Sequence, residues 1–377
     1  MTSHAAGRSS QQREPPSLMS APAQGGTIVF DQHQHQHQHQ QRDLRAPIPQ
    51  RPSLRLAASA EHQTNVAAHL TTRDRWLARM VAEHRVLTSP QIAAIAFGSR
   101  RSANHRLQKL HTWRVLDRFQ PYIGRGRAPM YYVLDTTGAH LLAHEDGLDP
   151  KDLKFRPERS VGIAYSLRLA HLMGVNNFFT TLLADALTNT TQDQTVTAWW
   201  SEARCGRHFG DHVRPDGYGR WHEAGREIEW FLEWDTGSYQ LSRFVSKLPG
   251  YTSLAAATNI VTPLLAVFAT AAREAHARRQ LVEHLRTDPQ RQALPIATTT
   301  AEHLRTAGSP AHDIWLPLHH ADGGRHRLIS LLSAWPHLEA PTSSADTSGT
   351  EPSPVPRLSP PTPTPPWQPS ELTWNPR

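Results

Sequence analysis

The chain has few of the residues that fix a fold covalently or hold it in a membrane. It contains a single cysteine, Cys205, in 377 residues, which excludes a disulfide framework and a cysteine-based zinc site. The longest apolar run, residues 253–272, is interrupted by Asn259 and Pro263, so it predicts a helix end followed by a buried strand rather than a membrane span. The N-terminus has no apolar signal segment. We therefore expect a cytoplasmic protein without membrane contact.

Apolar residues are also scarce. Hydrophobic residues make up 38% of the chain and the mean hydropathy is −0.55, which is low for a chain that is folded throughout. Residues 1–65, with an alternating His-Gln tract, and residues 339–377, rich in Pro, Ser and Thr, predict disordered tails, because neither can bury enough apolar surface to offset its ordering entropy. The remainder is long enough for two domains, which we place at residues 66–160 and 161–338.

Positive charge is concentrated in one short segment. The formal net charge of the chain is +7. Residues 73–127 hold 12 Arg and Lys against 3 Asp and Glu, a net of +9, whereas residues 161–340 hold 16 against 17, a net of −1. A local excess of this kind is typical of a surface that binds a polyanion, so we expect double-stranded DNA as the partner of this segment.

The basic segment has the element order of a winged helix-turn-helix. Apolar residues at helical spacing predict a helix over residues 73–88, Ser89 and Pro90 begin a second, and Ser99 or Ser102 caps a third within "SRRSANHRLQKLHTWRVL". Two β-rich runs, "VLDRF" and "MYYVLD", flank the loop "IGRGRAP" and predict a hairpin, the wing. Residues 136–145 predict one further short helix.

The third predicted helix has a polar face that fits a DNA groove. Ala103, Leu107 and Leu110 share its inward face. Side chains on the opposite face and at the tip of the wing are predicted to contact base edges or phosphates. These are Arg100, Arg101, Asn104, His105, Gln108, Arg125 and Arg127. The alternative is a winged helix that binds another protein, which an acidic recognition helix would favour.

Residues 161–338 predict a second domain of mixed type, so the fold class of the chain is α+β or α/β. The predicted elements, in chain order, are a helix (165–189), three strands (195–205, 211–221 and 226–237), a helix (239–257), a strand (259–270) and a helix (271–287). This α-β-β-β-α-β order is the core of the PD-(D/E)xK nuclease fold.

Acidic residues fall where such a nuclease needs them. Asp216 lies on the second predicted strand, and Glu233 and Asp235 lie on one face of the third. Phosphodiester hydrolysis uses Mg²⁺, which a few carboxylate oxygens hold and which lowers the pKa of the attacking water. Asp216, Glu233 and Asp235 are therefore candidate Mg²⁺ ligands and, with Lys247 on the following helix, candidate catalytic residues. Glu202 on the first strand is a further candidate.

The position of the lysine leaves two interpretations open. A nuclease of this fold normally has its lysine two residues after the Glu, where this chain has Asp235. Either Asp235 is a third ligand and Lys247 reaches in from the helix, or the site is inactive. Carboxylates gathered at one end of a sheet repel one another, so a metal ion or a basic side chain, Arg243 or Lys247, must offset them. Because Asp235 stands where the lysine is expected, we favour the inactive site, in which a salt bridge between a basic side chain and the carboxylates closes it.

The stretch that carries these residues resembles a known family. Pro215–Asp216, the E-x-D-x-G of Glu233–Asp235–Gly237 and the K-x-x-x-Y of Lys247–Tyr251, preceded by a basic winged helix, resemble the replication-relaxation family of actinobacterial plasmids and integrative elements. The similarity spans roughly residues 70–335. It implies a role in plasmid replication or DNA relaxation, with replication or mobilisation proteins, or a second copy of the chain, as further partners.

Three functions remain open at this point. The first is a Mg²⁺-dependent DNA endonuclease or nickase. The second is a non-catalytic transcriptional or replication regulator, whose second domain is a degenerate nuclease fold used for dimerisation or partner binding. The third is nicking by a tyrosine, Tyr239 or Tyr251, although no three-histidine cluster of the relaxase kind lies near either in the sequence.

Overall fold

The computed structural model describes most of residues 59–338. The described residues are 44–48, 59–123, 126–152, 155–189, 193–238, 240–286, 294–319 and 324–338, together with Met1 and Leu56. The His-Gln tract, Arg125, Tyr239 and the Pro-rich end of the chain lie outside them. The described part has a mixed α+β fold with sheets of six, three and two strands. No described helix is long and apolar enough to span a membrane.

Capping residues set the starts of the N-terminal helices. The helices α1, α2, α3, α4 and α5 cover Ala60–His69, Thr72–His84, Ser89–Ala96, Arg100–Thr112 and Thr136–Glu145. Thr71 and Thr88 each form a capping box, so Thr88, and not the expected Ser89, caps α3. Ser99 caps α4 by accepting a hydrogen bond from the backbone N–H of Ser102. The helices α1 to α4 therefore begin where a hydroxyl accepts from a free N–H group, and α5 begins where the carboxylate of Asp135 does so.

The helix α4 is held by its apolar side and by one arginine. Ala103, Leu107 and Leu110 are fully buried in the core beneath it. Arg106 donates from Nε to Asp74 Oδ1 on α2 (2.9 Å). Because these contacts use one side of α4, its opposite side remains at the surface.

A small antiparallel sheet follows α4. Its strands β2, β5 and β3 cover Leu87–Thr88, Tyr131–Leu134 and Leu116–Phe119, in the order β2-β5-β3. The register pairs Leu116 with Leu134 and Phe119 with Tyr131, so the two β-rich runs of the sequence do form a hairpin.

A second strand pair and α1 include residues that the composition assigns to a disordered tail. β1 (Arg45–Pro47) pairs with β4 (Pro121–Tyr122). Val66 of α1 is buried in the main core. The composition of residues 1–65 does not predict either feature, because both depend on later parts of the chain. β1 pairs with β4, and α1 packs on a core formed by residues that follow it.

The large sheet has the strand order β11-β10-β9-β8-β7-β6. In chain order, β6 to β11 cover Gln194–Ser201, Gly217–Glu223, Arg226–Trp234, Leu264–Phe268, Ile296–Thr300 and Leu316–Pro317. β6, β7 and β8 form an antiparallel meander, β8, β9 and β10 run parallel, and β11 is antiparallel to β10. Sequence patterns did not predict β10.

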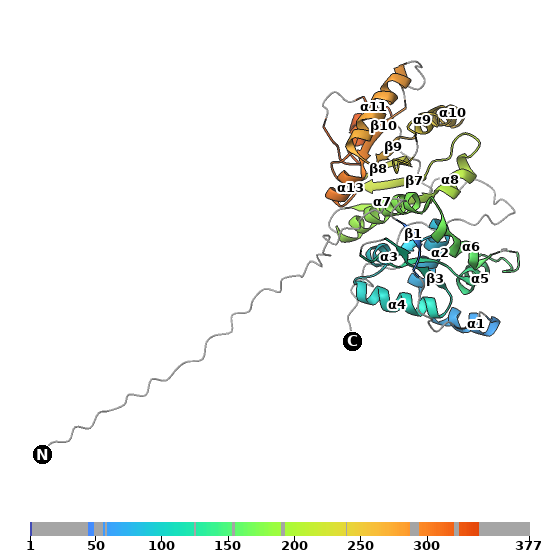
Figure 1. The fold of residues 1–377 in the computed structure, drawn as a ribbon. Helices are drawn as coiled ribbons and strands as arrows, with labels where there is room; N and C mark the ends of the chain where they lie inside the picture. Colours follow the sequence, from blue (N-terminus) through green and yellow to red (C-terminus); the bar gives the residue numbers. More distant parts are fainter. Residues whose placement is uncertain are drawn as a thin grey trace. The chain divides into compact units, whose positions relative to one another are not determined.

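Strand alternation directs the side chains of β8 into two different cores. Trp230 contacts Phe178 and Phe179 of α7 (Leu169–Thr188) on one face of the sheet. Phe231 contacts Tyr251 of α10 (Leu248–Thr258) on the other face, which α9 (Ser242–Val245) and α11 (Ala271–Arg286) also cover. Figure 1 shows α7 between the large sheet and the helices α2 and α3. By the same alternation, Glu233 faces α9 and α10.

Two elements of the second segment differ from those predicted. The first strand ends at Ser201, which caps α8 (Glu202–Phe209), so Glu202 begins a helix and is not on a strand. The helix expected over 239–257 is divided into α9 and α10, because Pro249 lacks the N–H that a continuous helix needs. Shorter helices complete the described part: α6 (Pro157–Val161), η2 (Gly162–Tyr165), α13 (Ala301–Ala307) and α14 (Leu331–Ala334).

Glycine allows α7 to approach the sheet closely. A Cβ atom added to Gly219 of β7 would lie 2.5 Å from the ring of Trp230 and 2.7 Å from that of Phe179. Gly174 of α7 lies equally tightly against the ring of Trp234. Larger side chains at these positions would push α7, and every residue it carries, away from the sheet.

The N-terminal helices share a core with the large sheet. Buried Asn176 of α7 donates from Nδ2 to the backbone carbonyls of His84 (3.2 Å) and Val86 (2.7 Å). The ring of His84 stacks on Trp199 of β6 with centroids 3.7 Å apart. Glu83 accepts hydrogen bonds from the N–H (3.1 Å) and hydroxyl (2.7 Å) of Ser201. These contacts fix the end of α2 against α7 and the start of α8.

Candidate functional site

Asp216 and Glu233 lie opposite each other at the ends of two neighbouring strands. β7 begins at Gly217, and the antiparallel register pairs Gly217 with Leu232, so the next pair outward is Asp216 with Glu233. The N–H of Asp216 donates to the carbonyl of Leu232 (3.0 Å), which continues the ladder. The exposed fractions of Asp216 and Glu233 are 7% and 6%. The structure therefore brings these two predicted site residues together in a nearly buried position.

Lys247 lies between the two carboxylates. Its Nζ donates to both oxygens of Glu233, at 2.7 and 2.6 Å, and lies 3.7 Å from Asp216 Oδ1. Lys247 immediately precedes α10, and Tyr251 follows about one turn later on the same face. The hydroxyl of Tyr251 donates to Glu233 Oε1 (2.5 Å). The K-x-x-x-Y spacing thus directs two donors at one carboxylate.

A histidine that the sequence analysis did not single out completes the site. His171, in the first turn of α7, donates from Nε2 to Asp216 Oδ2 (3.0 Å), and the N–H of Trp234 donates to the same oxygen (2.8 Å). Burial lowers the pKa of His171, but the charge of Asp216 and this hydrogen bond raise it above its ordinary value. No local pattern identifies His171, because only the packing of α7 on the sheet brings it to Asp216.

The two carboxylates have opposite pKa shifts. Burial alone would raise the pKa of Asp216, but His171, Lys247 and the N–H of Trp234 hold it at about 2. Burial and the charge of Asp216 raise the pKa of Glu233 to about 8, against the opposing effects of Lys247 and Tyr251. The environment thus favours the ionised form of Asp216 and disfavours that of Glu233.

Asp235 does not join this pair. Its carboxylate accepts two hydrogen bonds from Arg273 of α11, one from Nη2 at 3.0 Å and one from Nε. The N–H of Asp235 donates to the carbonyl of Val267 on β9 (2.8 Å). The expected convergence of three carboxylates is therefore replaced by a pair and a separate Arg–Asp ion pair, because α11 supplies a guanidinium at the point where the chain leaves β8.

Glu202 is likewise held by another residue. Both of its carboxylate oxygens accept hydrogen bonds from Arg168 Nη2, at 3.0 and 2.9 Å. Arg243, the other basic residue expected to offset the carboxylates, is exposed. Of these two basic residues, it is Lys247 that forms ion pairs with Asp216 and Glu233.

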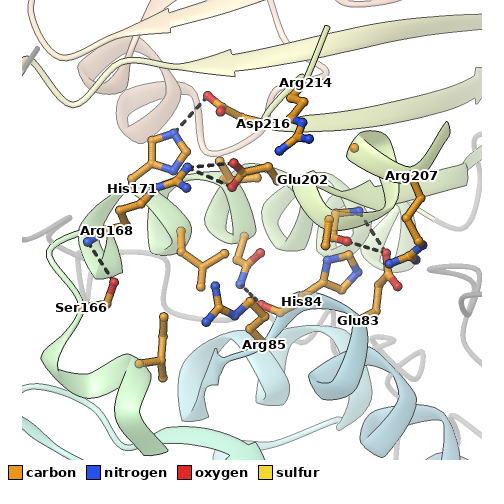
Figure 2. Close-up of a pocket in the computed structure, with 17 residues that line it drawn as sticks. Glu83, His84, Arg85, Ser166, Arg168, His171, Glu202, Arg207, Arg214 and Asp216 are labelled. Atoms are coloured by element: carbon orange, nitrogen blue, oxygen red, sulfur yellow. Dashed lines mark hydrogen bonds and ion pairs between the residues drawn. The ribbon is translucent and has the colours of Figure 1, made fainter. Parts of the chain in front are cut away.

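Two adjoining cavities open beside the site and together form what we call the groove. One, of about 390 Å³, is lined by Glu233, Lys247 and Arg243. The other, of about 450 Å³, extends toward Glu83 and Arg85 at the end of α2 (Figure 2). Both are lined by Arg168, His171, Glu202, Arg214 and Asp216. The Asp216–His171 pair therefore stands at the junction of the two cavities.

The carboxylates do not fit a shared divalent ion in this arrangement. Mg²⁺ requires free carboxylate oxygens at about 2.0–2.1 Å together with several waters. Both oxygens of Glu233 accept from Lys247, and Oδ2 of Asp216 accepts two further hydrogen bonds. Within the described part of the chain, no group of three or more His, Cys, Asp or Glu side chains could hold a metal ion. The ammonium of Lys247 takes the position between the carboxylates that a cation would need.

The second candidate surface is the outer side of α4. The exposed side chains there are Arg100, Arg101, Asn104, His105, Gln108 and Lys109. Arg127, after β4, is also exposed and donates from Nε to Gln120 Oε1 (3.2 Å). The structure thus brings the five predicted residues of α4 onto one surface, and Lys109 is a cation there that the sequence analysis did not include.

One comparison with known proteins gives a match. The model of the replication-relaxation family matches residues 79–270, which are 192 of the 377 residues. The matched range begins within α2 and ends after β9, and it includes α4, Asp216, Glu233 and Lys247. Neither the curated proteins nor the solved structures gave a match.

Proposed function

The chain belongs to the replication-relaxation family, and we propose that it is a DNA-binding protein that acts in the replication or relaxation of a plasmid or mobile element. In this proposal, α2, α3, α4 and the β3–β5 hairpin form a winged helix-turn-helix that binds duplex DNA. The following α/β segment is a nuclease-like domain that acts together with it.

The exposed face of α4 carries this proposal. α4 follows the helices α2 and α3 and precedes the hairpin, which is the order in which a winged helix presents its recognition helix. Its outer residues include the guanidinium groups of Arg100 and Arg101 and the amides of Asn104 and Gln108. Arginine and amide side chains are those that reach guanine and adenine edges, and arginine also pairs with phosphates. Exposed acidic residues would disfavour DNA on this face, and α4 has none.

For the second domain, the geometry best supports a non-hydrolytic role. Lys247 closes the space between Asp216 and Glu233, and Arg273 holds Asp235. In this state the acidic centre is an ion-pair network that orders β7, β8 and α10. The domain then holds DNA or a partner protein instead of cutting a strand.

One observation favours backbone cleavage as a second candidate. Glu233 has its pKa raised to about 8 and lies beside Asp216, whose pKa is about 2, in a groove open to solvent. Neighbouring carboxyl groups with widely separated pKa values are typical of sites that accept and donate protons. This feature alone does not supply a nucleophile, so cleavage remains the second candidate.

Incubation with supercoiled DNA separates the two candidates. The wild type, Asp216→Asn and Glu233→Gln are compared with and without Mg²⁺ or Mn²⁺, and binding is followed in parallel by mobility shift. Our proposal expects binding of the DNA without nicked or relaxed product. Nicking by the wild type that Asp216→Asn abolishes, with DNA binding retained, would establish cleavage instead, and failure of the wild type to bind DNA would reject both candidates.

A further inference from the structure

The larger cavity of the groove has an excess of positive charge. Figure 2 shows Arg85, Arg168, Arg207 and Arg214 around it, with Arg85 and Arg214 on opposite sides. All four arginines are exposed. In the described part of the chain, no ion pair or hydrogen bond involves the guanidinium group of Arg85, Arg207 or Arg214. These three cations are therefore available to an anionic ligand.

The carboxylates of the same cavity already have partners. Glu202 is paired with Arg168, Glu83 accepts two hydrogen bonds from Ser201, and Asp216 accepts from His171. Glu83 keeps its charge, because Ser201 is a neutral donor, but the four arginines of this cavity outnumber its three carboxylates. Guanidinium groups pair well with phosphate oxygens, so a phosphate-containing ligand suits this lining.

Two exposed side chains next to groove-lining residues in the sequence offer a second kind of contact. Tyr165 and Leu167 are exposed by 70% and 84%. Tyr165 is the last residue of η2, and Leu167 lies in the connection to α7. Leu167 lines the smaller cavity, and Ser166, which follows Tyr165, lines the larger one. An exposed aromatic ring beside a basic groove is the arrangement with which proteins bind single-stranded nucleic acid, because bases stack on the ring while cations hold the backbone.

The size of the cavity favours one strand over two. Its volume of about 450 Å³ is within the range of about 300–1,000 Å³ that is usual for small-ligand pockets, so it accommodates about one or two nucleotides but no base-paired duplex. The floor is fixed by Asn176, which bonds the end of α2, and by His84 stacked on Trp199. The binding surface is therefore formed before the ligand arrives.

We propose that the groove binds a single DNA strand, with Arg85, Arg207 and Arg214 holding its phosphates, Tyr165 stacking on a base, and the strand passing the Asp216–His171 pair. The inference rests on the proposed function in taking DNA as the nucleic acid. It adds a second DNA site, distinct from α4 and specific for single strands.

The test measures binding of a fluorescent oligothymidylate to the full-length protein by anisotropy. Arg207→Ala/Arg214→Ala should weaken binding at least about tenfold, because lost phosphate contacts also lose counterion release. The matched control is Arg226→Ala/Arg305→Ala, which removes two exposed arginines elsewhere and should leave binding within about twofold of wild type. Tyr165→Ala should weaken binding at least about fivefold, and Tyr165→Phe should restore it, since stacking needs the ring and not the hydroxyl.

The outcomes distinguish this inference from the function proposed above. Equal binding by the wild type, groove and control variants, or no binding of the oligothymidylate by the wild type, would overturn it. Strand binding that depends on the groove, combined with duplex binding that does not depend on Arg100 and Arg101, would uphold the groove and reject the role of α4. Groove variants that lose duplex binding while binding the oligothymidylate normally would also overturn the inference.

Discussion

The ammonium group of Lys247 lies 2.6 Å from Oε2 and 2.7 Å from Oε1 of Glu233, inside a sheet–helix interface that buries the carboxylate almost completely. This pair, together with Asp216 and Tyr251, determines both the stability of the site and its response to pH. Three predictions test these relationships and the surface of α4, and a fourth tests the packing of α7 on the sheet.

Replacing Lys247 by Met should destabilise the protein, and more so at high pH. Removing one partner of a buried ion pair typically costs about 3–5 kcal/mol, and we expect about 2–3 kcal/mol at pH 9 because Lys247 is partly exposed. At pH 6 the loss should be smaller, since Glu233, whose pKa is raised to about 8, then holds a proton. Urea unfolding at both pH values measures this. The double variant Lys247→Met/Glu233→Gln should recover most of the loss, and an equal loss at the two pH values would contradict the interpretation.

Asp216 should contribute stability that is lost in acid. Its folded-state pKa of about 2 lies below the ordinary value of 3.8, so the contribution is present above the ordinary pKa and disappears as the pH falls toward 2. At 1.36 kcal/mol per pKa unit the difference corresponds to about 2 kcal/mol. Thermal or urea unfolding between pH 5 and pH 2.5 should show a steeper loss for wild type than for Asp216→Asn. Parallel curves for the two proteins would show that Asp216 has no depressed pKa.

Alanine at both Arg100 and Arg101 should weaken binding to duplex DNA and reduce its dependence on salt. Each phosphate contact that is lost should lower the slope of log K against log salt by about 0.9. Anisotropy titrations with a labelled duplex at several salt concentrations measure both effects. Arg226→Ala/Arg305→Ala, which has the same change in net charge, should retain the wild-type slope. If both double variants lose affinity equally, only the total charge of the protein matters and α4 has no special role.

Gly219→Ala should destabilise the fold by about 1–3 kcal/mol, the usual cost of overpacking a core. The added methyl group would overlap the rings of Trp230 and Phe179. Gly98→Ala is the control, because Gly98 is exposed and has no atom within 4 Å of an added Cβ. Urea unfolding should separate the two variants clearly, and similar midpoints would show that α7 can move without cost.

The N-terminal helices could be predicted because their determinants are local. Hydroxyl caps, helical spacing and the helix over 136–145 are all set within one or two turns of the chain. Predictions failed where two local signals compete. Residues 195–205 begin with β-branched and aromatic residues, but Ser201 followed by Glu202 is also a helix start, and α8 forms there. Pro249 similarly divides a helix that the apolar pattern alone would continue.

The candidate site was predictable only in part. Asp216 and Glu233 could be paired from strand order, and Lys247 from its place on the next helix. The alternation of side chains along a strand also placed Asp235 on the same face as Glu233. It could not show that Arg273 pairs with Asp235, because Arg273 comes from a helix 38 residues later in the chain. His171 was missed for the same reason, since it reaches Asp216 from 45 residues earlier.

By itself, the sequence determined the caps and periods of the helices and strands, the basic segment around α4, and the family to which the chain belongs. Only the tertiary structure decided which charges meet: Lys247 with Glu233, His171 with Asp216, Arg273 with Asp235, and three free arginines around one groove. The physical reason is the separation along the sequence of the residues that interact. Helix and strand formation depend on neighbours within a few residues, whereas an ion pair depends on how separate elements pack. The close approach of α7 at Gly174 and Gly219 brings His171 to Asp216, and the packing of α10 and α11 on the other face brings Lys247 and Arg273 to their partners.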